Sequence, residues 1–492
     1  MKLSKLLEDL KYNVVQGTDN LEIDAISWDS RKTSQNSLFI CVKNRNVDRH
    51  DYAAAAAQHG AIALIIEHDI KEFINDITII KVEDSKKAMA KIASIYYEEP
   101  SKSFNLIGIT GTNGKTSVTY FVSKVLEGAD RLTGIIGTIE NTVGGRKLKT
   151  EKLNPTTPDS IELQESFREI AQAGASDVIM EVTSSALDKE RVSECDFDIG
   201  VFTNLTQDHL EEHGTMENYK KAKLKLFTMC RKILTNIDDP VSKEIKEIAA
   251  GKVYTYGIEN NADFKAFDVS YGLSAVEFSL KFKDEVKRVK FNIPGRFSVY
   301  NALATIGICY LSGLDLDMII HSLKNITGVP GRIENVPNDR GVLAVVDYAH
   351  SPDSLENIIK SMREISKGKV ITLFGCGGNR DKTKRPIMGE IAGRLSDFVV
   401  ITSDNPRTED PLIIINEIEQ GILKTNCDYI KYENRKEAIF EALSKAKEGD
   451  VVIIAGKGHE TYQIIGDTTI HFDDREVVSE YFNRYNAKVL IH

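Results

Sequence analysis

The stretch Thr110-Gly-Thr-Asn-Gly-Lys-Thr116 lies between an apolar run and a segment with a helical apolar pattern. Residues 104–109 have strand character and residues 117–126 predict a helix, so the glycine-rich turn is placed where backbone N–H groups and a helix N-terminus can face an anion. In such a loop Lys115 reaches the terminal phosphates of a nucleotide, and Thr116 is a ligand for Mg²⁺. The stretch therefore predicts a nucleotide-binding α/β domain.

The loop differs from the strict phosphate-loop pattern in one respect. That pattern needs glycine five positions before Gly114, but Ile109 stands there and the glycine is Gly108, one residue early. The sequence is thus a variant loop of the GTNGKT kind. The residues predicted to hold the phosphates are Gly111, Thr112, Asn113, Gly114, Lys115 and Thr116.

Composition limits the classes of protein that remain. The 492 residues are 41% hydrophobic and 28% charged, which is typical of a globular protein with several domains. A formal charge of −10 argues against nucleic acid as the main partner. The charged start and the absence of an apolar run of ~18 residues predict no signal peptide and no membrane span. Six scattered cysteines without a CxxC pair indicate reduced thiols, so we expect a cytoplasmic protein.

Three blocks follow one another along the chain. Residues 1–98 alternate short strands with helical stretches, residues 99–333 begin with the phosphate loop, and residues 334–492 alternate strands and helices to the end. Regular alternation of this kind predicts parallel, doubly wound sheets.

Candidate ligands stand at the ends of the predicted strands, where open parallel sheets bind ligands. Glu181 ends the strand 177–181, and as a carboxylate near a phosphate loop it is a candidate ligand for Mg²⁺. His209 follows the strand 199–204 and is a second candidate. Lys223 lies in the helical segment that comes next, where a lysine by itself would be interpreted as a solvated surface group.

Seven sequence motifs follow one another along the chain. They are GTNGKT (111–116), MEVTSSALDKERV (180–192), TNLTQDHLEEHGTMENYKKAK (203–223), VPGRIE (329–334), DYAHSPDSL (347–355), DNPRTEDP (404–411) and AGKGHE (455–460). In this order and spacing they resemble the motifs of the Mur ligases. The resemblance covers all three blocks, and the last two motifs are specific to the branch that adds the third residue of the peptidoglycan stem peptide.

The resemblance implies a three-domain architecture and a reaction. An N-terminal domain holds a UDP-sugar, a central P-loop-type ATPase domain holds ATP, and a C-terminal Rossmann-like domain holds the incoming amino acid. The implied reaction is ATP-dependent addition of meso-2,6-diaminopimelate to the D-glutamate γ-carboxylate of UDP-N-acetylmuramoyl-L-Ala-D-Glu through an acyl phosphate. We expect a monomer.

The resemblance also assigns the residues at the nucleotide. It implies one Mg²⁺ on Thr116, Glu181 and the ATP phosphates, and a second on His209 and a carbamylated Lys223. Carbamylation converts an ammonium that would repel Mg²⁺ into a carboxylate that binds it. Further residues matched to ATP binding are Asn301, Arg332, Asp347 and His350.

Two further groups of residues match substrate contacts. The residues matched to the UDP-muramoyl peptide are Ser30, Arg31, Thr156, Thr157, Thr183, Ser184, Lys189 and Arg191. The residues matched to the diaminopimelate pocket are Arg380, Asp404, Asn405, Pro406, Arg407, Gly456 and Glu460.

Three positions depart from the family pattern. The family usually has His where this chain has Ser185, Gln where it has Lys189, and Asn where it has Ser298. None of these removes a predicted metal ligand or the loop lysine. We expect activity with altered local contacts to the substrate peptide.

Two alternatives remain beside the diaminopimelate ligase. One is an L-lysine ligase of the same fold, which would be expected to lack Arg407, because the distal carboxylate of diaminopimelate needs a cationic partner. The other is a nucleotide-binding scaffold or regulatory protein that does not ligate.

Overall fold

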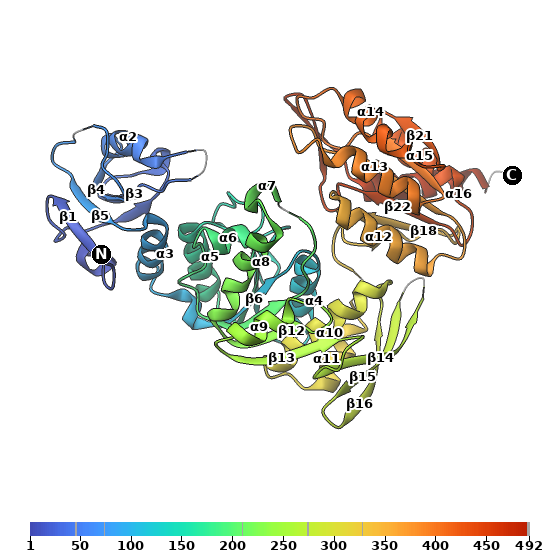
Figure 1. Ribbon diagram of the computed structural model, residues 1–492, viewed down its shortest axis with the longest axis horizontal. Coiled ribbons are helices and arrows are strands. Elements are labelled where there is room, and N and C mark those ends of the chain that lie inside the picture. Colours follow the sequence, from blue (N-terminus) through green and yellow to red (C-terminus); the bar gives the residue numbers. More distant parts are fainter. Residues whose placement is uncertain (45–46, 73, 209, 273–274, 327, 490–492) are drawn as a thin grey trace.

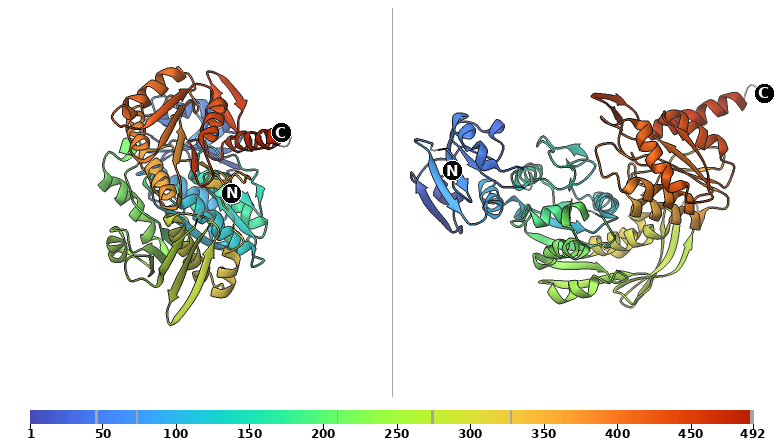
Figure 2. Two further views of the ribbon diagram at one scale, coloured as in Figure 1. Left: turned by 90° about the vertical axis from the view of Figure 1, so that its right-hand side faces the viewer. Right: turned by 45° about the horizontal axis from the view of Figure 1, so that its top comes forward.

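The computed structural model describes residues 1–44, 47–72, 74–208, 210–272, 275–326 and 328–489. Three bodies stand in a row, with the central one between the N-terminal and C-terminal ones (Figure 1). The right-hand view of Figure 2 shows the same order, and the left-hand view looks along the row, so the molecule is elongated. Each body has its own sheet and its own buried apolar clusters. The predicted organisation in three α/β parts is present.

The N-terminal sheet has the strand order β1-β5-β4-β3-β2. Neighbours from β2 to β5 run parallel, and β1 is antiparallel to β5. Its central strand β4 reads Ala-Ile-Ala-Leu-Ile-Ile, as expected for a parallel strand covered on both faces. The elements are α1 (Leu3–Leu6), β1 (Tyr12–Gln16), β2 (Ala25–Ser27), η1 (Ser30–Lys32), β3 (Ser37–Ile40), η2 (Arg49–Tyr52), α2 (Ala53–Gln58), β4 (Ala61–Ile66), β5 (Thr78–Val82) and α3 (Ser85–Tyr96).

The central sheet has eleven strands in the order β16-β15-β14-β13-β12-β11-β6-β10-β7-β8-β9. Its middle is parallel, and the strand before the phosphate loop, β6, lies between β10 and β11. The elements up to β11 are η3 (Pro100–Ser103), β6 (Asn105–Thr110), α4 (Lys115–Glu127), β7 (Thr133–Ile136), β8 (Thr142–Val143), β9 (Arg146–Lys147), α5 (Ser160–Gln172), β10 (Asp177–Glu181), α6 (Ser184–Asp188) and β11 (Phe197–Phe202).

The two ends of this sheet are antiparallel, so the prediction of wholly parallel sheets is wrong here. Buried and exposed residues alternate along β15, which is typical of an antiparallel strand with one solvated face. The remaining elements are α7 (Leu210–His213), α8 (Met216–Leu224), η4 (Lys225–Thr228), β12 (Cys230–Asn236), α9 (Ser242–Ile248), β13 (Lys252–Gly257), β14 (Phe264–Tyr271), β15 (Val276–Phe282), β16 (Glu285–Phe291), α10 (Arg296–Leu311) and α11 (Leu316–Leu323).

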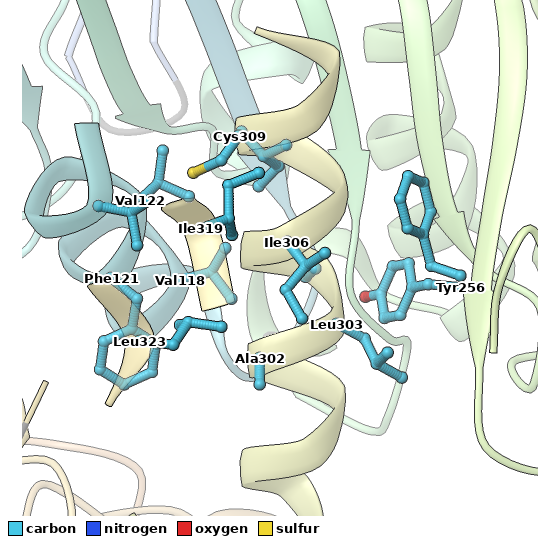
Figure 3. Close-up of a cluster of buried hydrophobic side chains, with 14 of the residues drawn as sticks. Val118, Phe121, Val122, Tyr256, Ala302, Leu303, Ile306, Cys309, Ile319 and Leu323 are labelled. Carbon is cyan, nitrogen blue, oxygen red and sulfur yellow. The ribbon is translucent and has the colours of Figure 1, made fainter. Parts of the chain in front are cut away.

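Helix α10 is the centre of the largest apolar cluster in this domain. It is apolar on all sides, as a helix covered all round must be. Val118 and Phe121 of α4 pack on one side of it, and Tyr256 of β13 packs on another (Figure 3). The helix that follows the phosphate loop is therefore fixed against a buried partner.

The C-terminal sheet has the order β17-β18-β22-β19-β20-β21, parallel except for β17, with the hairpin β23–β24 beside it. Helices cover both of its faces, so this domain has the predicted doubly wound form. Its elements are β17 (Glu334–Asn335), β18 (Leu343–Asp347), α12 (Pro352–Ile365), β19 (Val370–Phe374), α13 (Lys384–Leu395), β20 (Phe398–Thr402), α14 (Pro411–Ile422), β21 (Asp428–Tyr432), α15 (Arg435–Lys445), β22 (Val451–Ala455), β23 (Tyr462–Ile465), β24 (Thr468–His471) and α16 (Asp474–Val489).

Two other expectations can be compared with the fold. All six cysteines are free thiols, and all but Cys427 are buried. Within the described residues, every helix is too short or too polar to cross a membrane.

Candidate active site

The phosphate loop connects β6 to α4, and two of its glycines cannot be replaced without a clash. A Cβ on Gly111 would stand 1.9 Å from Thr203 Oγ1, and one on Gly114 would stand 2.9 Å from Asn301 Oδ1. Both glycines have positive φ, at 150° and 88°. Thr203 Oγ1 also donates to the carbonyl of Asn113 at 2.6 Å. The end of β11 and helix α10 thus hold the loop in shape.

Two lysine ammonium groups meet at the carbonyl of Gly111. Lys115 Nζ donates to the carbonyls of Gly111 and Thr112 at 2.8 Å each, and Lys223 Nζ donates to Gly111 O at 2.8 Å. Burial lowers the pKa of Lys115. Burial, and then the charge of Lys115, lower the pKa of Lys223 well below its ordinary value. The site therefore concentrates positive charge that backbone dipoles compensate only in part.

Glu181 stands at the end of β10 against the first turn of α4. Its Oε2 accepts from Thr116 Oγ1 at 2.9 Å, and its Oε1 accepts from the Thr138 amide at 2.8 Å. The carboxylate is almost fully buried, at 1% exposure. The structure brings the predicted metal ligands Thr116 and Glu181 together. The third candidate ligand, His209, lies outside the described residues.

A cavity of about 480 Å³ opens in front of the phosphate loop. It is lined by the central domain and by the start of the C-terminal domain, so two domains contribute to one site. The predicted site residues that line it are Thr112, Asn113, Gly114, Lys115, Thr116, Thr156, Thr157, Glu181, Thr183, Ser184, Lys189, Arg191, Arg332 and His350.

Arg191 organises the wall of the cavity on the side predicted to hold the muramoyl peptide. Its Nη1 donates to the carbonyl of Thr157 at 3.0 Å, and its Nε lies 2.5 Å from Asp159 Oδ1. Thr157 Oγ1 in turn donates to the carbonyl of Glu181 at 2.9 Å. This wall is therefore tied to the strand end that carries the candidate metal ligand.

The departures from the family pattern form local contacts of their own. Lys189 Nζ donates to Glu212 Oε1 at 2.7 Å and to Ser185 Oγ at 2.8 Å, so two departures share one network at the cavity wall. Ser298 Oγ donates to the carbonyl of Pro294 at 2.7 Å inside α10.

Arg332, at the end of the central domain, and Tyr348 and His350 of the C-terminal domain also line the cavity. The Arg332 guanidinium lies 4.8 Å from the centre of the Tyr348 ring, and its Nε has no hydrogen-bond partner within the described residues. Asp347 is not among the lining residues; its oxygens accept from the amides of Ile333 and Ala349 at 2.9 and 2.7 Å. Asp347 therefore braces the chain on either side of the cavity wall.

Asp353 is a site residue that the sequence analysis missed. Its Oδ2 accepts from Asn113 Nδ2 at 2.7 Å and from Thr206 Oγ1 at 2.8 Å, which joins the first turn of α12 to the phosphate loop. In Figure 1, α12 lies on the side of its domain that faces the central domain. An acidic residue in a first helical turn is normally a favourable surface group, so the sequence offered no signal for this contact.

The residues matched to diaminopimelate gather where β19, β20 and β22 end, outside the lining of the cavity. Asn405 Nδ2 donates to Glu460 Oε2 at 2.8 Å, and Arg407 Nη1 donates to the carbonyl of Gly378 at 2.9 Å. A Cβ on Gly456 would stand 2.5 Å from Asp404 Oδ2. Arg380 is exposed on the loop after β19, and Pro406 lies between Asn405 and Arg407.

The two residues matched to the UDP end lie apart from the cavity. Ser30 and Arg31 begin η1 in the N-terminal domain and are not among the lining residues. Ser30 is buried, and its carbonyl lies 2.8 Å from His59 Nδ1. Arg31 is exposed and pairs with Asp29 at 2.6 Å.

Three family models match the chain in succession. They are described as "Mur ligase family, catalytic domain" over residues 22–97, "Mur ligase middle domain" over residues 109–309, and "Mur ligase, glutamate ligase domain" over residues 331–458.

Proteins named UDP-N-acetylmuramoyl-L-alanyl-D-glutamate--2,6-diaminopimelate ligase are similar over almost the whole chain. One from Clostridium acetobutylicum is 47% identical over 98% of this chain and 99% of its own length. One from Caldanaerobacter subterraneus is 47% identical over 98% of both chains. One from Clostridioides difficile is 45% identical over 98% of this chain and 99% of its own length.

Solved structures are also similar to this chain over most of its length. A structure titled with the same enzyme name has a TM-score of 0.72 and 29% identity, over 99% of both chains. The MurF ligase of Thermotoga maritima in complex with ADP has a TM-score of 0.62 at 21% identity, over 94% of this chain and 98% of its own, and that likeness supports the fold alone.

Proposed function

This chain belongs to the Mur ligase family, and we propose how its cavity and loops perform the ligation that its relatives are named for. The protein is an ATP-dependent ligase of peptidoglycan synthesis. It joins meso-2,6-diaminopimelate to the D-glutamate γ-carboxylate of UDP-N-acetylmuramoyl-L-Ala-D-Glu and forms ADP and phosphate. The family resemblance and the three-domain architecture expected from the motifs are confirmed.

One observation supports the mechanism: two cationic side chains that are far apart in the sequence face the same cavity. Lys115 lies on the phosphate loop and Arg332 lies at the end of the central domain, and within the described residues neither is hydrogen-bonded to a carboxylate. Bringing ATP and a substrate carboxylate together concentrates negative charge. Cations held in place beforehand stabilise that charge as the phosphoryl group transfers.

The reaction then follows in two steps. The γ-carboxylate oxygen of D-glutamate attacks the γ-phosphorus of ATP, and ADP leaves as an acyl phosphate forms. The amine of diaminopimelate attacks the acyl carbon, and the tetrahedral intermediate collapses to the amide with loss of phosphate and a proton. Lys115 and Arg332 stabilise charge in the first step, and the phosphate loop orients the nucleotide.

We propose that Thr116 and Glu181 would hold one Mg²⁺ together with the ATP phosphates, and that His209 and a carbamylated Lys223 would hold a second. The hydroxyl and the carboxylate are hard oxygen donors that already meet at 2.9 Å, which suits this ion. When bound, Mg²⁺ neutralises phosphate charge.

We further propose that Lys223 acts as a carbamate. Its Nζ is buried beside that of Lys115 on a single carbonyl, which is unfavourable for two ammonium ions, and burial lowers the pKa of Lys223 well below its ordinary value. A neutral amine can react with CO₂, and the resulting carboxylate would be attracted to Lys115 and to Mg²⁺.

Exhaustive removal of CO₂ and bicarbonate tests the carbamate. We expect activity to fall and to return when bicarbonate is added, and Lys223→Arg to be nearly inactive, because a guanidinium cannot replace a carboxylate that faces a metal. Lys225→Arg, at a half-exposed lysine two residues later that pairs with Asp188, is the matched control. Full activity of the CO₂-free enzyme would contradict the assignment.

We also propose binding roles for the three domains and for the remaining residues that were predicted to contact the substrates. We assign UDP-sugar binding to residues 1–98 with Ser30 and Arg31, ATP binding to residues 99–333, and amino-acid binding to residues 334–492. Thr156, Thr157 and Arg191 would hold the muramoyl peptide, since they line the cavity wall. We propose a cytoplasmic monomer.

Phosphate release tests the function directly. The enzyme is given ATP, Mg²⁺ and UDP-N-acetylmuramoyl-L-Ala-D-Glu, with diaminopimelate or with L-lysine. We expect release to depend on the dipeptide substrate and to be much faster with diaminopimelate. Faster release with lysine would support the lysine ligase instead, and no release with either would support the scaffold interpretation.

A further inference from the structure

Lys457 is a buried ammonium at the amino-acid end of the site for which the mechanism above has no use. Its side chain is 0% exposed. Nζ lies 3.2 Å from Glu460 Oε2 and 3.3 Å from Asn405 Oδ1, and 5.4 Å from the centre of the Tyr462 ring. The group therefore contacts two of the residues assigned to diaminopimelate, although it is itself inaccessible to a ligand.

The contacts of Asn405 fix the orientation of its amide. Its Oδ1 accepts from Lys457 Nζ and from the amide of Ile464 at 3.0 Å, so its Nδ2 must point the other way. That Nδ2 donates to Glu460 Oε2 at 2.8 Å. The ammonium and the amide thus hold the same carboxylate oxygen of Glu460.

The backbone explains why the lysine points inward. Gly456 and Gly458 on either side of it have positive φ, at 118° and 54°, which an L side chain rarely adopts. A Cβ on Gly458 would stand 2.7 Å from Tyr348 Cβ. The loop is therefore wrapped closely around the lysine.

We propose that Lys457 is a positioning residue for the amino-acid substrate. It holds Oε2 of Glu460 and the amide of Asn405, so that the other oxygen of Glu460 receives an ammonium group of diaminopimelate. A buried ammonium needs a charged partner, and Glu460 is that partner. Without the ammonium of Lys457, the carboxylate of Glu460 would be unpaired and would take up a different position. This inference rests on the proposed function.

A comparison with a second buried cation distinguishes a role in positioning the substrate from a role in stability alone. Arg435, another buried cation of this domain, makes two hydrogen bonds to Asp474, a buried carboxylate of α16 with no assigned role in binding, and donates also to the carbonyls of Ser403 and Ala455. Lys457 instead pairs with a carboxylate that remains 17% exposed.

The kinetics of the Lys457→Met variant test the proposal. Methionine removes the charge but keeps an unbranched side chain of similar length. We expect KM for diaminopimelate to rise about thirtyfold or more, because truncating one partner of a buried charge pair is costly, while KM for ATP and for the UDP substrate stays within about twofold. Lys457→Arg keeps the charge and should recover most of the loss. Lys436→Met, at a surface lysine paired with Glu480, is the matched control.

A double-mutant cycle with Glu460→Gln separates positioning from general damage. If Lys457 acts through Glu460, adding Lys457→Met to Glu460→Gln should change KM for diaminopimelate by less than about threefold, whereas independent effects would multiply. Should Lys457→Met not fold, Lys457→Gln replaces it in the cycle with the same expectation.

Parent activity with diaminopimelate is measured first. An inactive parent overturns the proposed function and this inference with it. An active parent whose Lys457→Met variant has an unchanged KM for diaminopimelate, an equal rise of KM for ATP, or multiplying effects in the cycle overturns the inference alone.

Discussion

The buried cations of the phosphate loop and those of the C-terminal domain have different partners. Lys115 and Lys223 donate to backbone carbonyls of the loop. Arg435 makes two hydrogen bonds to Asp474, at 2.8 and 2.7 Å, and Arg385 pairs with Glu409 and Glu417. A cation with its own carboxylate is already neutralised. A buried cation whose only partners are backbone carbonyl dipoles still attracts an anion.

The physical reason lies in what burial does to a charge. Removing a charged group from water is costly unless another charge or several hydrogen bonds replace the water. Arg435 meets that requirement within the protein and so contributes to the fold. Lys115 meets it fully only when phosphate or carboxylate oxygens arrive, so the cost of its burial favours binding.

Arg435→Met should show the largest effect, and it should be on stability. Removing one partner of a buried pair leaves Asp474 uncompensated, which costs about 3–5 kcal/mol. Thermal and urea unfolding followed by circular dichroism would measure it. Arg484→Met, at an exposed arginine of α16 paired with Glu480, should change the midpoint little. If Arg435→Met had the same unfolding midpoint as the parent, a cation paired with a carboxylate would contribute no more to the stability of the fold than one bonded only to backbone carbonyls.

Lys115→Ala should show the opposite behaviour, with intact folding and lost catalysis. The phosphoryl group loses a direct cationic partner, which should lower the rate by roughly 10²–10³ or more. Phosphate release and unfolding are measured on the same preparation. Lys124→Ala, at an exposed lysine of the same helix, is the control. Near-parent turnover of Lys115→Ala would refute the loop assignment.

Arg407→Ala tests whether a cation of the C-terminal domain can also be held ready for a ligand. Within the described residues, the only hydrogen bonds of its guanidinium are from Nη1 to the carbonyls of Gly378 and Asn405. Removing it should leave the distal carboxylate of diaminopimelate unpaired but affect lysine far less.

The expected result for Arg407→Ala is a drop of at least about tenfold, or roughly 1.4 kcal/mol, in the ratio of kcat/KM for diaminopimelate over lysine. Competition assays with both amino acids would measure it. An equal loss for both would mean that Arg407 organises the loops and does not recognise the substrate.

Asp353→Ala should have the smallest effect. It removes two hydrogen bonds between the domains, which we expect to raise KM for ATP by about fivefold, close to 1 kcal/mol. Asp317→Ala, in the first turn of α11, controls for a lost acidic group at a helix N-terminus. A double-mutant cycle with Thr206→Val should show coupling, and purely additive effects would indicate that the contact between the domains carries no binding energy.

Much of the fold follows from local patterns. The strand 177–181 was predicted with the bounds that the structure has, because a short apolar run bounded by polar residues specifies a buried strand. The antiparallel end of the central sheet was missed. Its signal was present in the alternation Val-Glu-Phe-Ser-Leu-Lys-Phe at 276–282 and in the short polar turn that follows.

The candidate site likewise contains residues that the sequence predicted and residues that it did not. Local sequence sufficed to predict a glycine-rich turn between a strand and a helix, whereas the close approach of Thr203 to Gly111 and of Asn301 to Gly114 comes from distant segments. The resemblance, residue by residue, supplied the candidate contacts to the substrates and to the metal. Asp353 and Lys457 were not recognised, because an acidic helix start and a loop lysine are ordinary surface features when only the sequence is known.

The sequence alone determined that a glycine-rich turn joins a strand to a helix and that polar groups stand at strand ends, because these features depend on dihedral angles and short-range periodicity. Only the tertiary structure decided which charges meet. Lys223 reaches the carbonyl of Gly111 across 112 positions, and Asp353 reaches Asn113 across 240. The environment of a buried charge is set by whichever carbonyls and carboxylates long-range packing brings within about 3 Å, and no local pattern encodes that.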